Sequence, residues 1–215
     1  MRIPVSSLLA KALRRDIRGV SIVEFALALP LLLFGTLGGL ETAHLVITRM
    51  RVNQIATSLA DNASRMKQQT VSGAPKVREY DVNEAFKAAE RQGDDLNLLA
   101  NGRMIVSSLE YDPVGKRQWF QWQRCQGSKT SYTSDFGKQQ VTIAGVRGPG
   151  GLLTAEPDAA IMVAEVIYQY QPLIMADLFK SFEIRQFKAM YVRDDRDLSK
   201  PGIWNLEPKA GVSNC

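Results

Sequence analysis

The stretch that decides the fold lies at residues 14–40 and reads RRDIRGVSIVEFALALPLLLFGTLGGL. A basic segment comes first, Gly19 follows it, and a single carboxylate, Glu24, interrupts the start of an apolar run. A carboxylate in a bilayer segment is costly and is kept only where it has a partner or a task. The stretch therefore predicts a membrane anchor in which Glu24 has a function of its own.

The apolar run predicts one transmembrane helix at residues 20–47. Residues 25–40 carry no charge, and with their flanks they reach the ~20 residues needed to span a bilayer. The preceding segment, residues 1–19, is a basic leader, and the positive-inside rule places it in the cytoplasm and the chain beyond the span outside. A cleaved secretory signal is disfavoured because the run exceeds the ~7–15 apolar residues of such signals.

Three residues in the span bear on its shape and packing. Pro30 removes one backbone hydrogen bond and predicts a kink or a loosened turn. Gly35 and Gly39 are four residues apart, a spacing that lets helices approach closely. The alternative is that Gly and Pro are simply common in transmembrane helices.

The helix is expected to continue beyond the membrane as an amphipathic helix at residues 48–69. Its apolar residues recur every three or four positions, as on one face of a helix. They are Val52, Ile55, Ala56, Leu59, Ala63 and Met66.

Residues 76–215 predict a folded α+β domain. A helix is expected at 82–91 and strands at 104–111, 118–124, 159–170 and 184–192. The fold class is therefore α+β, with a long N-terminal helix packed on a small antiparallel sheet. In the second strand, strict alternation places Phe120 and Trp122 on the same face.

The charge distribution separates the anchor from the domain. Residues 1–69 hold nine basic and four acidic side chains, whereas residues 70–215 hold 18 of each. A nucleic-acid-binding domain would carry its positive charge on the folded part. A nucleic-acid partner is therefore not expected.

The two cysteines, Cys125 and Cys215, both follow the predicted span. A disulfide between them is expected, because an extracytoplasmic location permits it and it would tie down the tail. In the chain-entropy model such a bond contributes up to ~4–5 kcal/mol. The alternative is two free thiols.

Motifs for catalysis are missing from the sequence. His44 is the one histidine, and we find no HExxH, CxxC, P-loop, GxGxxG or GxSxG pattern. We therefore expect no enzyme, no cofactor and no metal site.

Residues 18–30 (RGVSIVEFALALP) resemble the N-terminal signature of the TadE-like family of minor pseudopilins. These proteins belong to the Tad (tight adherence, Flp-type) type IV pilus machinery. The signature joins a basic leader, a glycine, a glutamate five residues later, an aromatic residue and an apolar run with a proline. Residues 165–173 (EVIYQYQPL) also resemble a strand of this family.

The resemblance implies that a prepilin peptidase cuts between Gly19 and Val20. In related pilins the glutamate at the fifth mature position meets the new α-amine of a neighbouring subunit, so the assembly contact falls on Glu24, with Phe25 beside it. The alternative is that Glu24 snorkels to the cytoplasmic headgroups. Phe25 replaces the tyrosine of major pilins, and the domain is large, so a minor subunit is favoured.

The resemblance further implies the location and the partners. The protein would be a single-pass protein of the bacterial inner membrane with a periplasmic C-terminal domain, either retained there or incorporated in the pilus. Its partners would be other pilins and pseudopilins of the Tad machinery and the prepilin peptidase. The competing hypothesis is a membrane-anchored binding or adhesin module that uses its anchor only for attachment.

Overall fold

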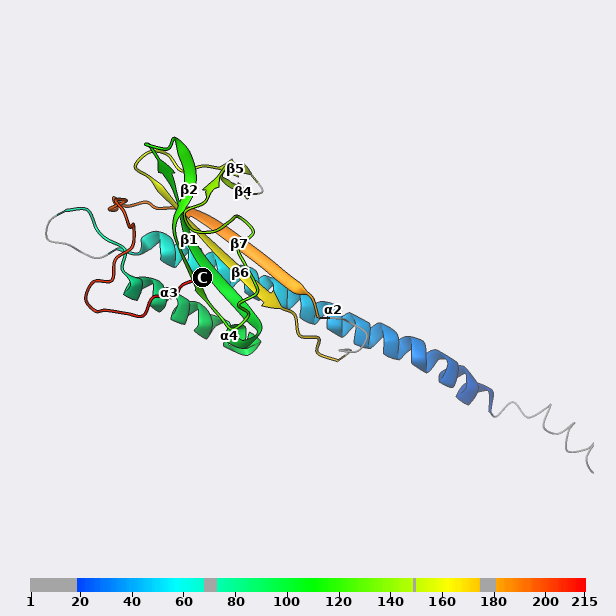
Figure 1. Cartoon of the computed structure of the whole chain (residues 1–215). Coiled ribbons are helices and arrows are strands. Elements are labelled where there is room, and N and C mark those ends of the chain that lie inside the picture. The colour runs from blue at the N-terminus through cyan, green and yellow to red at the C-terminus, as the bar shows by residue number, and fades with distance from the viewer. Residues whose placement is uncertain (1–18, 68–72, 149, 175–180) are drawn as a thin grey trace, which may run out of the picture.

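A long apolar helix packed on a curled antiparallel sheet makes up the α+β fold, as predicted (Figure 1). The computed structural model describes residues 19–67, 73–148, 150–174 and 181–215. The predicted leader lies outside the described residues except for Gly19.

Helix α2 (Val20–Arg65) has 46 residues and runs through Pro30 without a break. It ends four residues before the predicted end at 69, because Met66 turns to an extended conformation. The Arg196 side chain donates to the main-chain oxygens at this end, with 2.6 Å to that of Met66. A cationic side chain at a helix C-terminus satisfies carbonyls that lack a partner in the helix.

The main sheet has five antiparallel strands in the order β3-β2-β1-β6-β7. The predicted strands are present with bounds shifted by a few residues, and one short strand was not predicted. The bounds are β1 Gly102–Asp112, β2 Arg117–Gln126, β3 Thr142–Ile143, β6 Ala160–Gln169 and β7 Glu183–Tyr191. Strands β4 (Val146–Gly148) and β5 (Gly151–Leu153) form a separate pair.

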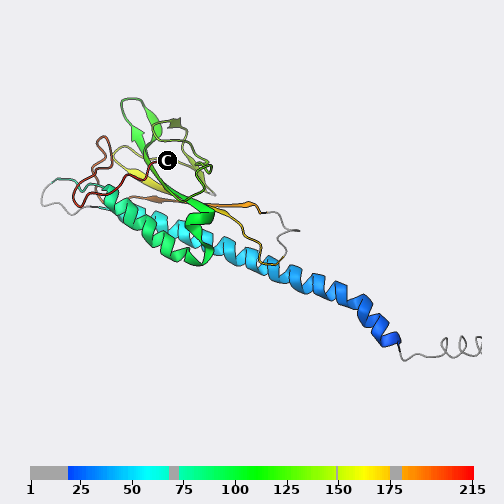
Figure 2. The same ribbon diagram turned by 60° about the horizontal axis from the view of Figure 1, so that its bottom comes forward.

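Helix α3 (Glu79–Gln92) lies beside α2 on the same side of the sheet (Figure 2). It is followed by a 3₁₀ turn (Asp94–Leu96) and by the short helix α4 (Leu98–Asn101), which leads into β1. A buried ion pair joins the start of α3 to β2, since the Arg124 guanidinium donates to the Glu79 carboxylate at 2.9 Å.

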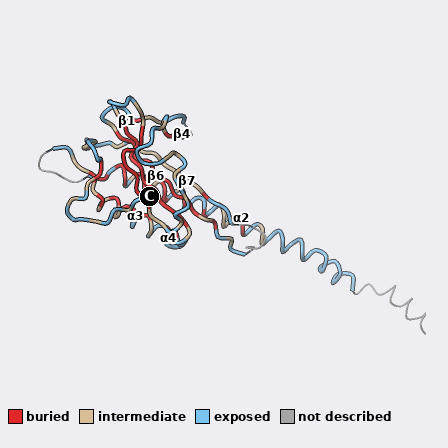
Figure 3. Tube along the Cα trace, viewed as in Figure 1, coloured by how far each residue is buried: buried red, intermediate tan, exposed pale blue. Residues whose placement is uncertain are grey.

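The main core lies between the two helices and the sheet, and the opposite sheet face carries two smaller clusters under loops. Among the described residues, burial is concentrated in the sheet, in α3 and in α2 from Glu41 onward (Figure 3). The apolar stripe predicted at residues 52–66 is buried in the main core.

The placement of Phe120 and Trp122 on one face was wrong. Trp122 packs in the main core and Phe120 in a cluster on the opposite face. The pairing with β1 shows the reason: Ser108 faces Trp122 and Leu109 faces Phe120, so Gln121 is an extra residue in a β-bulge. A bulge inserts one residue and reverses the alternation beyond it.

Candidate assembly site on the long helix

The first half of α2 is exposed and apolar. Residues 20–36 are all exposed, and Glu41 is the first buried residue of the helix (Figure 3). Among the described residues, α2 is the one helix long and apolar enough to cross a membrane, judged by length and composition. Residues 20–40 measure about 31 Å at 1.5 Å per residue, close to the ~30 Å of a bilayer core.

Gly19 is the N-cap of α2, with φ −90° and ψ −8°, and its carbonyl accepts the Val23 amide at 3.2 Å. This conformation is open to any residue. A Cβ at Gly19 would meet no atom within 4 Å. The fold of this chain therefore does not require a glycine at the predicted processing site.

Glu24 and Phe25 lie on the exposed part of α2, and 60% of Phe25 is accessible. Glu24 makes no side-chain hydrogen bond or ion pair with the residues that the structure describes. Its charge is therefore left for a partner outside the described part of the chain.

The predicted helix-packing residues Pro30, Gly35 and Gly39 are also exposed. A Cβ at Gly35 or Gly39 would meet nothing within 4 Å. Their spacing of four residues places them on one helix face. The described part of the domain does not cover this face, so the small residues are not needed for packing within the chain.

Glu41 forms a contact that the sequence did not reveal. It is only 2% exposed, although it lies inside the predicted span of residues 20–47. Its carboxylate accepts the Tyr170 hydroxyl at 2.6 Å and the amides of Leu173 and Ile174, each at 3.1 Å. We call these four residues the Glu41 clasp. The clasp binds the segment after β6 to the point where α2 meets the domain.

Aromatic contacts surround the clasp. The Tyr170 ring lies 5.7 Å from that of His44 and 5.2 Å from that of Phe182, centroid to centroid. The Arg49 guanidinium lies 5.9 Å from the centre of the Phe182 ring, a cation–π distance. His44 thus packs on an aromatic ring.

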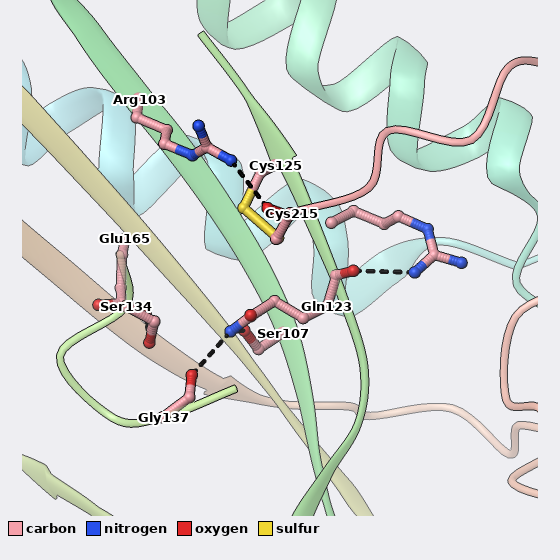
Figure 4. The surroundings of a disulfide bond; sticks show 9 residues. Arg103, Ser107, Gln123, Cys125, Ser134, Gly137, Glu165 and Cys215 are labelled. Carbon is pink, nitrogen blue, oxygen red and sulfur yellow. Dashed lines mark hydrogen bonds between the residues drawn. A yellow bond between two sulfur atoms is a disulfide. The ribbon is translucent and has the colours of Figure 1, made fainter. Parts of the chain in front are cut away.

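The predicted disulfide between Cys125 and Cys215 is present. It joins β2 to the C-terminal tail, on the sheet face opposite α2 (Figure 4). The Cys125 amide also donates to the Ser213 oxygen at 2.8 Å. The bond stabilises the domain and lies apart from the exposed half of the helix.

Another buried carboxylate, that of Glu110, lies near the C-terminal end of β1. Glu110 is 3% exposed and accepts the Ser108 hydroxyl at 2.6 Å. Burial raises the pKa of Glu110 to about 7, against a smaller opposite effect of Ser108 and Arg196. Burial also lowers the pKa of Arg196 to about 10. Both groups lie in the domain, so their ionisation affects its stability rather than the exposed helix.

These features define a class: an α+β protein with one candidate membrane-spanning helix, half exposed and half packed on an antiparallel sheet. The model of the TadE-like protein family matches residues 19–61 and confirms the predicted resemblance. The match begins at the predicted processing site and ends within α2. It associates the chain with the Tad pilus machinery in general. Comparisons with curated proteins and with solved structures gave no match.

Proposed function

We propose that this protein is a minor pseudopilin that takes part in assembling a Tad-type pilus. The observation that carries the proposal is the position of the TadE-like segment, which includes the whole exposed half of α2. Glu24 lies there with its charge unpartnered among the described residues. A helix built only as an anchor has no need of a carboxylate at this depth.

Cleavage between Gly19 and Val20 by a prepilin peptidase is part of the proposal. The absence of any contact for a Cβ at Gly19 supports it. Because the fold does not require a glycine there, the small residue can instead serve a molecule that approaches the backbone closely, as a peptidase does. The cut frees the α-amine of Val20, one helical turn before Glu24.

The proposed task of Glu24 is to pair with such an amine on another subunit. Pairing neutralises two charges before the helices pack side by side, where an isolated charge would be expensive. A single polar contact in an apolar bundle also sets the axial register of the helices. The exposed small residues Gly35 and Gly39 then allow a neighbouring helix to approach closely.

The proposal also specifies how the protein is oriented in the membrane, and it assigns the protein no catalytic activity. In this orientation the N-terminus lies in the cytoplasm and the domain in the periplasm, which the excess of basic residues before the span supports. The partners are then other pilins and pseudopilins, the peptidase and the inner membrane. The domain acts as a structural unit rather than an enzyme.

The decisive measurement is the mass of the N-terminal peptide of the protein purified from its host. We expect a mature chain that begins at Val20. A chain with an intact leader, or one cut near residues 39–43, would contradict the proposal.

A second experiment addresses Glu24. We expect Glu24→Ala to be cleaved normally but to reduce the number of pili strongly, because the amine loses its partner. Ser21→Ala, an exposed change one turn away, is the matched control and should leave pili unchanged. Normal pili in Glu24→Ala would remove the role assigned to this residue.

The competing binding module makes the opposite prediction for the anchor. Replacing residues 20–40 by an unrelated transmembrane helix should abolish assembly if the helix packs with other pilins. A module that uses the helix only for attachment would keep its function after this exchange.

A further inference from the structure

The exposed surface of α2 stays uncharged beyond the point where the domain begins to cover the helix. Between Phe25 and Thr48 the helix carries one acidic residue and no Lys or Arg. That acidic residue is Glu41, which the clasp buries. The exposed surface is therefore free of acidic and basic side chains over 24 residues, which measure about 36 Å at 1.5 Å per residue.

This uncharged stretch continues past the hydrocarbon core of a bilayer. A core of about 30 Å that begins at Val20 ends near Leu40. Beyond it, Val46, Ile47 and Met50 are each at least half exposed. The helical turn of 3.6 residues places these three on the side of α2 that faces away from the domain. Contiguous apolar surface of this kind marks a region that a membrane or another apolar partner covers.

Leu173 and Ile174 lie at the same level as this outer part of α2. Their amides each donate to the Glu41 carboxylate at 3.1 Å, and Glu41 is the first residue beyond such a core. Figures 1 and 2 show this end of β6 beside α2, where the helix leaves the domain. The Leu173 and Ile174 side chains are 58% and 42% exposed. Where α2 spans a bilayer, the domain therefore brings two exposed apolar side chains to the membrane surface.

The clasp satisfies the polar groups that such a position would otherwise leave without partners. A main-chain amide that faces lipid needs an acceptor within the protein. The amides of Leu173 and Ile174 have that acceptor in the Glu41 carboxylate. The carboxylate also accepts the Tyr170 hydroxyl, so its charge is enclosed rather than presented to lipid. The apolar side chains remain at the surface.

An aromatic ring and a cation mark the outer limit of this level. Phe182, the residue before β7, is 37% exposed, and the Arg49 guanidinium lies 5.9 Å from the centre of its ring. Arginine side chains lie along apolar surface and keep their charge among the headgroups. Arg49 is also the first basic residue after the uncharged stretch. The apolar surface thus ends where basic side chains begin, as it does at a membrane–water interface.

We propose that the domain rests on the membrane, with the Leu173 and Ile174 side chains inserted among the phospholipid headgroups of the leaflet on the domain side. The continuity of this apolar surface with the exposed half of α2 favours lipid as its partner. The spanning helix and this second contact together hold the domain in one orientation on the bilayer. The proposal rests on α2 spanning a bilayer, as in the proposed function, and needs no contact with another pilin.

The test is depth-dependent fluorescence quenching of the full chain in vesicles of phosphatidylcholine and phosphatidylglycerol. A cysteine introduced at Leu173 is labelled with the fluorophore NBD. The two native cysteines are bonded to each other and do not react. Nitroxide-labelled phosphatidylcholines serve as quenchers, either near the headgroup or near the bilayer centre. We expect labelled Leu173→Cys to lose more fluorescence with the shallow quencher than with the deep one.

Two leucines of similar exposure are the matched controls. Leu33, in the exposed half of α2, is 49% exposed and should lose more fluorescence with the deep quencher. Leu152, on β5, is 50% exposed and should lose little with either quencher. Ile174→Cys repeats the measurement if Leu173→Cys does not fold.

The possible outcomes separate the lipid contact from the spanning of α2. Quenching at Leu33 without quenching at Leu173 and Ile174 would overturn this proposal and leave the spanning helix intact. No quenching at Leu33 would overturn the membrane orientation in the proposed function as well. A blue-shifted emission at Leu173 that appears only at a high ratio of protein to lipid would assign the surface to a second copy of the chain and overturn the lipid contact.

Discussion

The Glu41 clasp gives the sharpest prediction about how the domain is held on its helix. The carboxylate accepts three donors, one from the Tyr170 hydroxyl and two from the amides of Leu173 and Ile174. Tyr170→Phe removes the hydroxyl at 2.6 Å and keeps the ring that packs on His44. Glu41→Ala removes the acceptor of all three donors. The two changes therefore weaken the clasp to different extents.

The magnitudes follow from the bonds. A hydrogen bond to a charged group contributes about 1.5–3 kcal/mol, so Tyr170→Phe should lower the free energy of opening the clasp by that amount. Because 1.36 kcal/mol is a factor of ten, amide protection at Leu173 and Ile174 should fall roughly ten- to a hundredfold. In Glu41→Ala the same amides lose their acceptor altogether, and both residues are exposed, so water can reach them. We expect them to exchange at nearly unprotected rates.

The measurement is hydrogen exchange of the full chain in micelles, read at the amides of Leu173 and Ile174. Thr42→Val is the matched control. The Thr42 hydroxyl bonds only within the helix, to the Gly38 oxygen at 2.8 Å, and is exposed. If the two amides exchange equally in the wild type and in Glu41→Ala, the clasp does not hold this segment and the reasoning is refuted.

Three further predictions concern the stability of the domain. Glu79→Ala leaves the buried Arg124 unpaired and should lower the free energy of unfolding by about 3–5 kcal/mol, measured by denaturant titration; a loss below 1 kcal/mol would contradict a buried pair. Replacing Cys125 and Cys215 by serine should cost up to ~4–5 kcal/mol and release the tail; unchanged proteolysis of the tail would count against this. Burial raises the pKa of Glu110 from 4.5 to about 7, so the folded state keeps a proton that the unfolded state has lost. The free energy of unfolding should therefore fall by roughly 3 kcal/mol as pH rises through this window. Glu110→Gln should remove most of that fall, and an equal fall in the variant would refute the assignment.

Features that depend only on neighbouring residues could be predicted from the sequence. The apolar run, the helical stripe after it and the β-rich segments gave the long helix and the antiparallel sheet, because periodicity is a property of neighbouring residues. Phe120 and Trp122 were misplaced because the bulge at Gln121 arises from the pairing of β2 with β1, which local alternation does not contain.

Glu24 and Glu41 look alike in the sequence, one at each end of an apolar run, and the structure separates them. Glu41 is satisfied by its own domain through donors about 130 residues further along the chain, whereas Glu24 has no partner among the described residues. Glu41 lies seventeen positions after Glu24, a rise of about 25 Å along the helix, which approaches the thickness of a bilayer core. Because α2 is continuous and the clasp fixes the domain at Glu41, the number of residues between the two glutamates sets both the distance and the direction of Glu24 relative to the domain. The exposed half of α2 thus presents one charged side chain, unpaired among the described residues, at a defined position, which suits the proposed assembly contact better than a simple anchor.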